Sequence, residues 1–145
     1  MLYALHDDDG QIHQANKLYE GRKGHRKYRG MLRNLGHRFV VADAPGLLPP
    51  ELWYVDVKGQ ELCKRPPMAI DVSKTRIKCG TKDSALLTNC PARARFTIHT
   101  SGVEIHAGEL DATELELFIP VPCVYRVRIE CFPYKAFSVD IEAAA

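Results

Sequence analysis

Apolar and polar residues alternate along much of the second half of the chain, as they do in β-strands that have one buried and one exposed face. The clearest run extends from Cys123 to Cys131, where Tyr125, Val127 and Ile129 alternate with charged residues. If this strand paired one residue out of register, its charged residues would enter the core. The pattern therefore predicts both a strand and its register.

The same alternation predicts seven further short strands between residues 68 and 145. They are expected at 68–72, 76–79, 84–88, 95–99, 103–107, 115–119 and 137–141. Glycine, proline, asparagine and serine residues separate the runs, and these residues are typical of turns. About eight short strands at such close spacing indicate an antiparallel β-sandwich rather than alternating strands and helices. The fold class predicted for the chain is therefore mainly β.

The first 67 residues predict a small β-rich region. Strand-like runs at 2–6 and 11–15 flank an acidic turn that ends in Gly10, which is typical of a β-hairpin. Two more strand-like runs, 37–42 and 52–57, lie on either side of a proline-rich loop, and a stiff, proline-containing linker over residues 63–67 follows. We expect this region to have little core of its own and to dock on a partner.

One short helix is expected within this N-terminal region. Apolar residues recur there with the i, i+3, i+4, i+7 spacing of an amphipathic helix, at Tyr28, Met31, Leu32 and Leu35. Gly24 and Gly30 each weaken a helix by about 1 kcal/mol relative to alanine. We therefore predict a helix over residues 27–35 that Gly36 ends.

Composition indicates a soluble globular protein. The chain has 145 residues, of which 46% are apolar and 26% charged, which excludes a disordered chain. No run approaches the roughly 18 apolar residues that a membrane-spanning helix needs. The amino end also lacks the basic and then apolar layout of a signal peptide. We expect a protein that is made and kept in the cytosol and has no membrane contact.

The residues that commonly carry chemistry form no recognisable set. The five cysteines are an odd number without a CxxC pair, which argues against a disulfide framework and a zinc site. Cys123 and Cys131 are expected to be small core residues. The aspartates before Gly10 lack the spacing of a calcium-binding loop, and no HExxH, GxSxG, Walker or GxGxxG motif occurs. The sequence thus predicts a non-enzymatic protein without catalytic residues, metal or cofactor.

Positive charge is concentrated in one segment. Residues 22–38 contain seven basic residues and no acidic one: Arg22, Lys23, Arg26, Lys27, Arg29, Arg33 and Arg38. Such a segment can bind phosphates, with Tyr19 or Tyr28 stacking on a base, or it can contact an acidic protein surface. The overall pI, near 8.3, is below the usual value for nucleic-acid-binding domains. We therefore favour a solvated helix face, which also suits acidic protein partners, over a nucleic-acid site, and we expect only weak, non-selective nucleic-acid binding.

A second candidate contact surface is apolar and aromatic. The proline-rich loop and the strand after it place four large side chains close together in the sequence: Leu47, Leu48, Trp53 and Tyr54. Aromatic and apolar residues of this kind are common in the centre of protein–protein interfaces. We expect these four residues to contact a partner, and a core position for Trp53 stays open as an equal alternative.

Two stretches resemble bacterial immunoglobulin-like modules. The run from Ser73 to Leu87, with its glycine turn and Asp-Ser-Ala step, is similar to their opening strands. The run from Pro122 to Val127 resembles their Pro/Gly-x-Tyr-x-Val strand. The first ten residues and the step from Cys131 to Tyr134 are similar to small tailed-phage virion proteins that end in this domain. The resemblance implies an Ig-like sandwich over residues 68–145, preceded by an N-terminal docking region over residues 1–67.

The resemblance also implies a function. It indicates a non-enzymatic structural component of a tailed-phage particle, associated with the tail as a fibre, baseplate or tail-adaptor contact. Such a component is located in the virion, contacts other virion proteins and is present in several copies within a symmetric assembly. Two alternatives stay open: a capsid decoration or cement protein, and a nucleic-acid-binding accessory protein that uses the basic segment 22–38.

Overall fold

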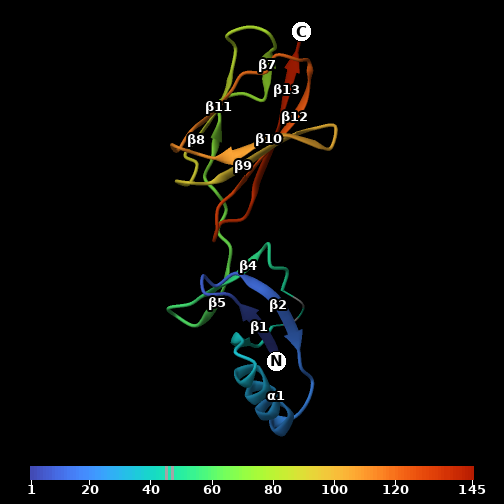
Figure 1. Ribbon diagram of the computed structural model, residues 1–145, viewed down its shortest axis with the longest axis vertical. Coiled ribbons are helices and arrows are strands. Elements are labelled where there is room, and N and C mark those ends of the chain that lie inside the picture. Colours follow the sequence, from blue (N-terminus) through green and yellow to red (C-terminus); the bar gives the residue numbers. More distant parts are fainter. Residues whose placement is uncertain (45, 47) are drawn as a thin grey trace. The chain divides into compact units, whose positions relative to one another are not determined.

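The chain forms two compact units, which are described separately. The computed structural model describes residues 1–44, 46 and 48–145. Its N-terminal unit comprises Met1–Arg65 and its C-terminal unit Pro66–Ala145 (Figure 1). Antiparallel sheets dominate, and one helix lies among the described residues. The prediction of a mainly β fold with one helix is therefore confirmed.

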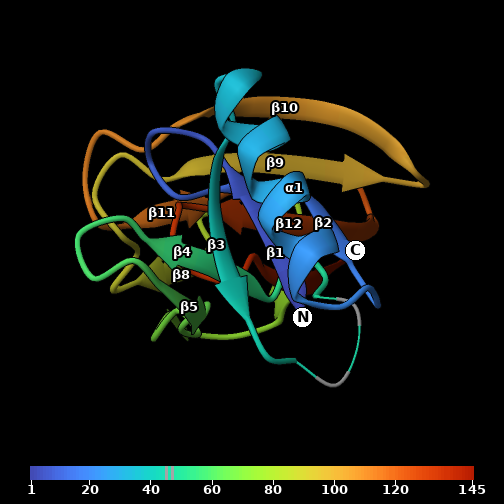
Figure 2. The ribbon, with the colours of Figure 1, turned by 90° about the horizontal axis from the view of Figure 1, so that it is seen from below.

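The N-terminal unit has three layers: a helix, a three-stranded sheet and a β-hairpin. Its elements are β1 Leu2–His6, β2 Ile12–Lys17, α1 Arg22–Asn34, β3 Arg38–Ala42, β4 Trp53–Asp56 and β5 Glu61–Lys64. The sheet has the order β2-β1-β3, and β4 pairs with β5. Figure 2 shows α1 in front of β1, with β3 on one side and β2 on the other.

Apolar side chains fill both spaces between these layers. On the helix side the buried residues are Tyr3, Leu5 and Leu32. On the hairpin side they are Leu2, Ala4, Ile12, Val40, Leu48 and Val55. Every residue of β1 is buried, because the strand is covered on both faces. The expectation that this region has little core of its own is wrong: a short strand with apolar residues on both faces can bury them when a helix and a hairpin cover it.

Gly10 connects the first hairpin to the second. Its φ of +93° is a conformation that glycine adopts without strain. A Cβ at this position would overlap the backbone carbonyl of Val55. The Gly10 carbonyl accepts a hydrogen bond from the Val55 N–H at 2.8 Å. The turn predicted at residues 7–10 therefore also fixes strand β4 against the sheet.

Helix α1 begins five residues earlier than predicted and ends where expected. The Gly36 N–H donates to the carbonyl of Arg33 and the His37 N–H to that of Leu32, which is the glycine-terminated cap of a Schellman motif. At the other end the helix continues through Gly24 and starts at Arg22. Tertiary packing of one helix face offsets the weak intrinsic propensity of glycine, and sequence spacing alone did not reveal that packing.

The C-terminal unit is a β-sandwich. Its strands are β6 Asp71–Val72, β7 Arg76–Lys78, β8 Ala85–Thr88, β9 Arg95–Thr100, β10 Val103–Glu109, β11 Leu115–Leu117, β12 Cys123–Glu130 and β13 Phe137–Ala144. One sheet has the order β10-β9-β12-β13-β7 and the other β11-β8-β6. All pairs are antiparallel except β7 with β13. This strand order, with the first strand divided between the two sheets, is that of an Ig-like sandwich.

The predicted register of strand β12 is confirmed. Tyr125, Val127 and Ile129 are buried, whereas the charged residues between them are exposed. The Tyr125 hydroxyl donates to the carbonyl of Val121 at 3.1 Å, which is the tyrosine corner found at this point of Ig-like sandwiches. Burial raises the pKa of Tyr125, followed by smaller effects of the Cys123 and Cys79 thiols. The phenol therefore stays a hydrogen-bond donor at neutral pH.

Several strand boundaries differ from the predictions. Strand β6 has two residues rather than five, whereas β13 continues to Ala144. Strand β5 lies partly within the segment predicted to be a stiff linker, because Leu62 faces the core while the strand pairs with β4. Cys123 and Cys131 are half-buried at the edge of the core rather than fully inside it, and Cys90 is the buried cysteine.

Candidate functional site

The inner face of helix α1 is fixed against the sheet by aromatic and polar contacts. The Tyr3 hydroxyl lies 2.7 Å from Nδ1 of His25. Tyr28 packs edge-on against the Tyr3 ring, with 4.9 Å between the ring centroids, and accepts a hydrogen bond from Asn16 at 2.8 Å. Leu32, on the same face of the helix, is buried against Tyr3 and Leu5 of the sheet. These contacts hold the helix in one orientation, so its outer face is a preformed surface.

The outer face and flanks of the helix carry the basic residues that the sequence singled out. The six on the helix are Arg22, Lys23, Arg26, Lys27, Arg29 and Arg33. In the part of the chain that the structure describes, none of the six forms an ion pair. Arg38, on β3, pairs instead with Asp8. The six cations thus form no ion pair, although the carboxylate of Glu20, just before the helix, lies beside Gly24 in the first turn.

The charges at the start of α1 oppose the helix dipole. The first turn contains Arg22 and Lys23 and no acidic residue, and Gly21 provides no side-chain cap. A cation near the positive end of a helix is unfavourable by about 0.3–1 kcal/mol. A helix optimised for stability alone would place acidic residues there. The Glu20 carboxylate beside Gly24 offsets part of this repulsion, and an anionic partner would relieve the rest.

Four arginines form a row along one flank of the helix. Arg22, Arg26, Arg29 and Arg33 follow each other at spacings of four, three and four residues and line a hollow of about 330 Å³ beside Met1. Arg29 is anchored, because its guanidinium lies 6.0 Å from the centroid of the Tyr3 ring and donates to the Tyr3 hydroxyl at 3.4 Å. The other three are exposed. Such a row suits carboxylate or phosphate oxygens, which arginine binds in bidentate fashion.

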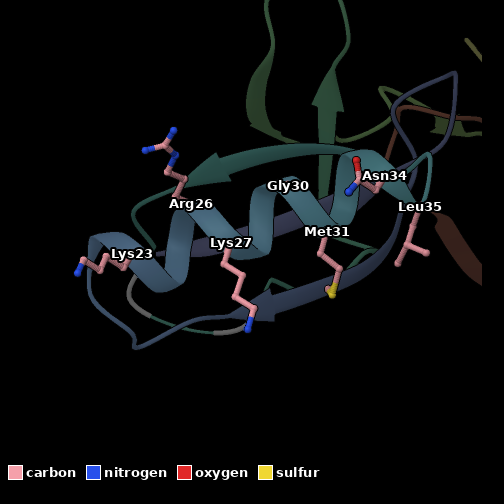
Figure 3. A pocket seen from close by; sticks show the side chains of 7 residues that line it. All are labelled: Lys23, Arg26, Lys27, Gly30, Met31, Asn34 and Leu35. Atoms are coloured by element: carbon pink, nitrogen blue, oxygen red, sulfur yellow. The ribbon is translucent and has the colours of Figure 1, made fainter.

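A second part of the exposed helix surface combines positive charge with exposed apolar side chains. Lys23, Lys27, Met31 and Leu35 line an open hollow of about 580 Å³ (Figure 3). Figure 3 shows Arg26 and Lys27 projecting to opposite sides, with Met31 on the side of Lys27. Met31 is 46% and Leu35 64% exposed. Apolar side chains among cations are typical of a surface that contacts a protein.

The described members of the second predicted contact set do not form an exposed apolar surface. Leu47 lies outside the described residues. Leu48 is buried in the core on the hairpin side, so its predicted contact with a partner is wrong. It is buried because the hairpin and sheet of its own unit cover it. Trp53 is half-buried, packs on the same core and has the Lys64 ammonium 5.6 Å from its ring centroid. Tyr54 is half-buried beside it on strand β4.

An acidic surface of the C-terminal unit was not singled out from the sequence. Its five carboxylates are Glu104 and Glu109 on β10, Asp111 and Glu114 on the connection, and Glu116 on β11. All five are exposed, and within residues 1–44, 46 and 48–145 none forms an ion pair. We call this surface the acidic edge, because β10 and β11 are edge strands of the two sheets.

An apolar groove lies between these two edge strands. It has a volume of about 440 Å³, and its lining includes Ile98, Ile105, Leu117 and Phe118. Ile105 is 51% and Phe118 57% exposed. None of the five carboxylates lines the groove, but Glu104 and Glu116 are chain neighbours of Ile105 and Leu117, which do. A sequence signal for it exists: residues 96–125 contain five acidic residues and no lysine or arginine.

Other kinds of site find no support among the described residues. No group of three or more histidine, cysteine, aspartate or glutamate side chains there is arranged to hold a metal ion. None of the helices in that part of the chain has the length and apolar character needed to cross a membrane. Comparisons of the chain with protein-family models, with curated proteins and with solved structures found no match. The basic face of α1 is thus the candidate site.

Proposed function

We propose that the protein is a non-enzymatic structural component of a tailed-phage particle and that the basic face of α1 docks on an acidic surface of another virion protein. The observation that carries the proposal is the set of six cations that form no ion pair with any described residue, on a helix that is already packed in place. Met31 and Leu35, exposed among these cations, supply apolar contact area. Charge then provides attraction and orientation, and the apolar residues provide contact energy.

The particle assignment is supported by the resemblance of the chain to small virion proteins with a terminal Ig-like domain. A tail location, as a fibre, baseplate or tail-adaptor contact, is the version we favour, and capsid decoration is the alternative. In both versions the N-terminal unit docks and the Ig-like unit is displayed or packs against neighbours. In both, the protein is located in the virion after synthesis in the host cytoplasm.

The test is mass spectrometry of purified particles, followed by complementation with variants. We expect the protein in stoichiometric amounts with the structural proteins. The triple variant R26E/K27E/R33E should lose incorporation, because its docking face is then acidic. A matched control, K58E/K82E/K135E, makes the same change in net charge at three exposed lysines outside α1 and should be incorporated normally. Absence of the wild-type protein from particles would overturn the proposal.

A second candidate is a nucleic-acid-binding accessory protein. The observation that favours it is Tyr19, which is 85% exposed beside the basic helix and has the Lys17 ammonium 5.4 Å from its ring centroid. An exposed aromatic ring among cations can stack on an unpaired base. We expect weak, non-selective binding whose affinity falls steeply between about 50 and 200 mM salt. Tight binding at physiological salt in gel-shift assays would favour this candidate over the structural role.

A further inference from the structure

We infer that the acidic surface on which α1 docks is the acidic edge of a second copy of this chain, so that copies join head to tail. The inference rests on the proposed function, since it names the partner of the same basic face. It is carried by two surfaces that complement each other in charge and in apolar content. One lies on the N-terminal unit and the other on the C-terminal unit.

The two surfaces match in their charges. Helix α1 exposes cations over a segment without acidic residues, and the acidic edge exposes carboxylates over a segment without lysine or arginine. Neither set forms ion pairs with described residues, and the one cation opposite the acidic edge in the β9–β10 register is Arg95, across from Glu109. By contrast, Arg126, on the exposed face of β12, is paired with Asp140 at 2.9 Å. Unpaired charges of opposite sign on one chain favour association between copies.

The surfaces also match in their apolar content. On α1 the exposed apolar side chains are Met31 and Leu35, which lie beside Lys27. On the acidic edge they are Ile105 and Phe118, which border the groove between β10 and β11. Methionine is unbranched and flexible, so it fits irregular apolar grooves. Protein–protein interfaces combine an apolar core with a polar rim, and each of the two surfaces offers both apolar and charged residues.

The geometry of such a contact determines the kind of assembly. The two surfaces are different, so the contact is heterologous: each copy offers one basic face and one acidic edge. A heterologous contact repeats from copy to copy and closes into a ring or continues as a filament. Acidic residues on edge strands also hinder unwanted strand pairing. If these carboxylates only prevent strand pairing between copies, the protein should not self-associate, and the experiment below would show a monomer.

Charge reversal on each surface, followed by mixing, tests the inference. Sedimentation velocity on the full chain after nuclease treatment should show salt-sensitive self-association of the wild type at about 50 mM salt. The variant R26E/K27E/R33E and the variant E104K/D111K/E114K should each lose it. An equimolar mixture of the two variants should associate again, and so should a chain that carries all six changes. The control K58E/K82E/K135E should associate like the wild type.

Three results would overturn the inference: a monomeric wild type at all concentrations, association that survives either reversal, or no recovery in the mixture. Loss of association on nuclease treatment would also overturn it and would favour nucleic acid as the partner of α1. These outcomes are separate from the particle test. A protein that is found in particles but is monomeric and shows no recovery on mixing would retain its structural role and have a different acidic partner.

Discussion

Replacing Val127 with aspartate tests the register of the C-terminal sandwich. Val127 is fully buried on β12, opposite Ile98 of β9 and Val139 of β13. Losing the buried apolar side chain costs about 1.5–3 kcal/mol. Leaving a polar group there without a partner costs about 1–3 kcal/mol more. Together these costs are about 2.5–6 kcal/mol. A unit of this size has a total stability of roughly 4–12 kcal/mol at the usual value per residue, so the substitution removes a large part of it.

The matched control is the neighbouring substitution Arg128→Asp. Arg128 is on the opposite face of the same strand, and its side chain is about half exposed, with an ion pair to Glu130 at 2.6 Å. Exposed ion pairs contribute at most about 1 kcal/mol. The expected decrease in the melting temperature of the C-terminal unit is therefore no more than about 4–8 °C, whereas Val127→Asp should leave the unit largely unfolded.

The assay can observe the two units separately. Trp53 is the one tryptophan of the chain and lies in the N-terminal unit, so its fluorescence reports on that unit. Hydrogen exchange of peptides from β12 and β13 reports on the C-terminal unit. In Val127→Asp we expect protection of β12 and β13 to disappear while the Trp53 transition stays in place. Equal destabilisation by Val127→Asp and Arg128→Asp would refute the register.

Two further predictions concern single residues. Gly10→Ala should strongly destabilise the N-terminal unit, because the new Cβ would overlap the Val55 carbonyl. Gly30→Ala, on the open side of α1, should instead stabilise this unit by about 1 kcal/mol. Thermal unfolding followed by Trp53 fluorescence compares the two variants. The hydrogen bond from Arg126 holds the pKa of Asp140 below its usual value. Its stabilising effect is therefore present above the unfolded pKa, near 3.8, and is lost as pH falls through the lower folded value; Asp140→Asn should weaken this acid dependence in pH-dependent melting experiments.

The sequence predicts the orientation of strands that have one solvent-exposed face, but it does not predict the position of strands that are buried on both faces. In β12 the alternation of Val127 and Arg128 states directly which side faces the core. In β1 every residue is buried, so the strand was predicted but its central position was not. That position depends on α1 covering one face and the β4–β5 hairpin the other, which is tertiary information. The lack of tertiary information in the sequence also explains why Leu48, which lies in the core, was predicted to be at a contact surface.

The candidate site was predicted in part. The sequence alone shows that basic residues cluster in one segment, and helix α1 brings six of these residues onto one surface. The acidic edge was missed because its carboxylates are distributed over β10, a connection and β11. Counting charge over the whole C-terminal half also hides it, since residues 68–145 carry nine basic and ten acidic residues. Only the fold places the two edge strands on either side of one groove.

The buried core of the N-terminal unit changes the free energy expected for the proposed docking. A region that folds only on its partner would lose much of its interaction energy to ordering, and that was the expectation for a segment with little core. Because α1 is already fixed through Tyr3 and Leu32, the basic face can bind without that loss. Its charges are solvent-exposed, so each contact stays weak and sensitive to salt. A contact of this kind becomes stable only when several copies bind at once, since each additional contact in a closed assembly forms at high effective concentration.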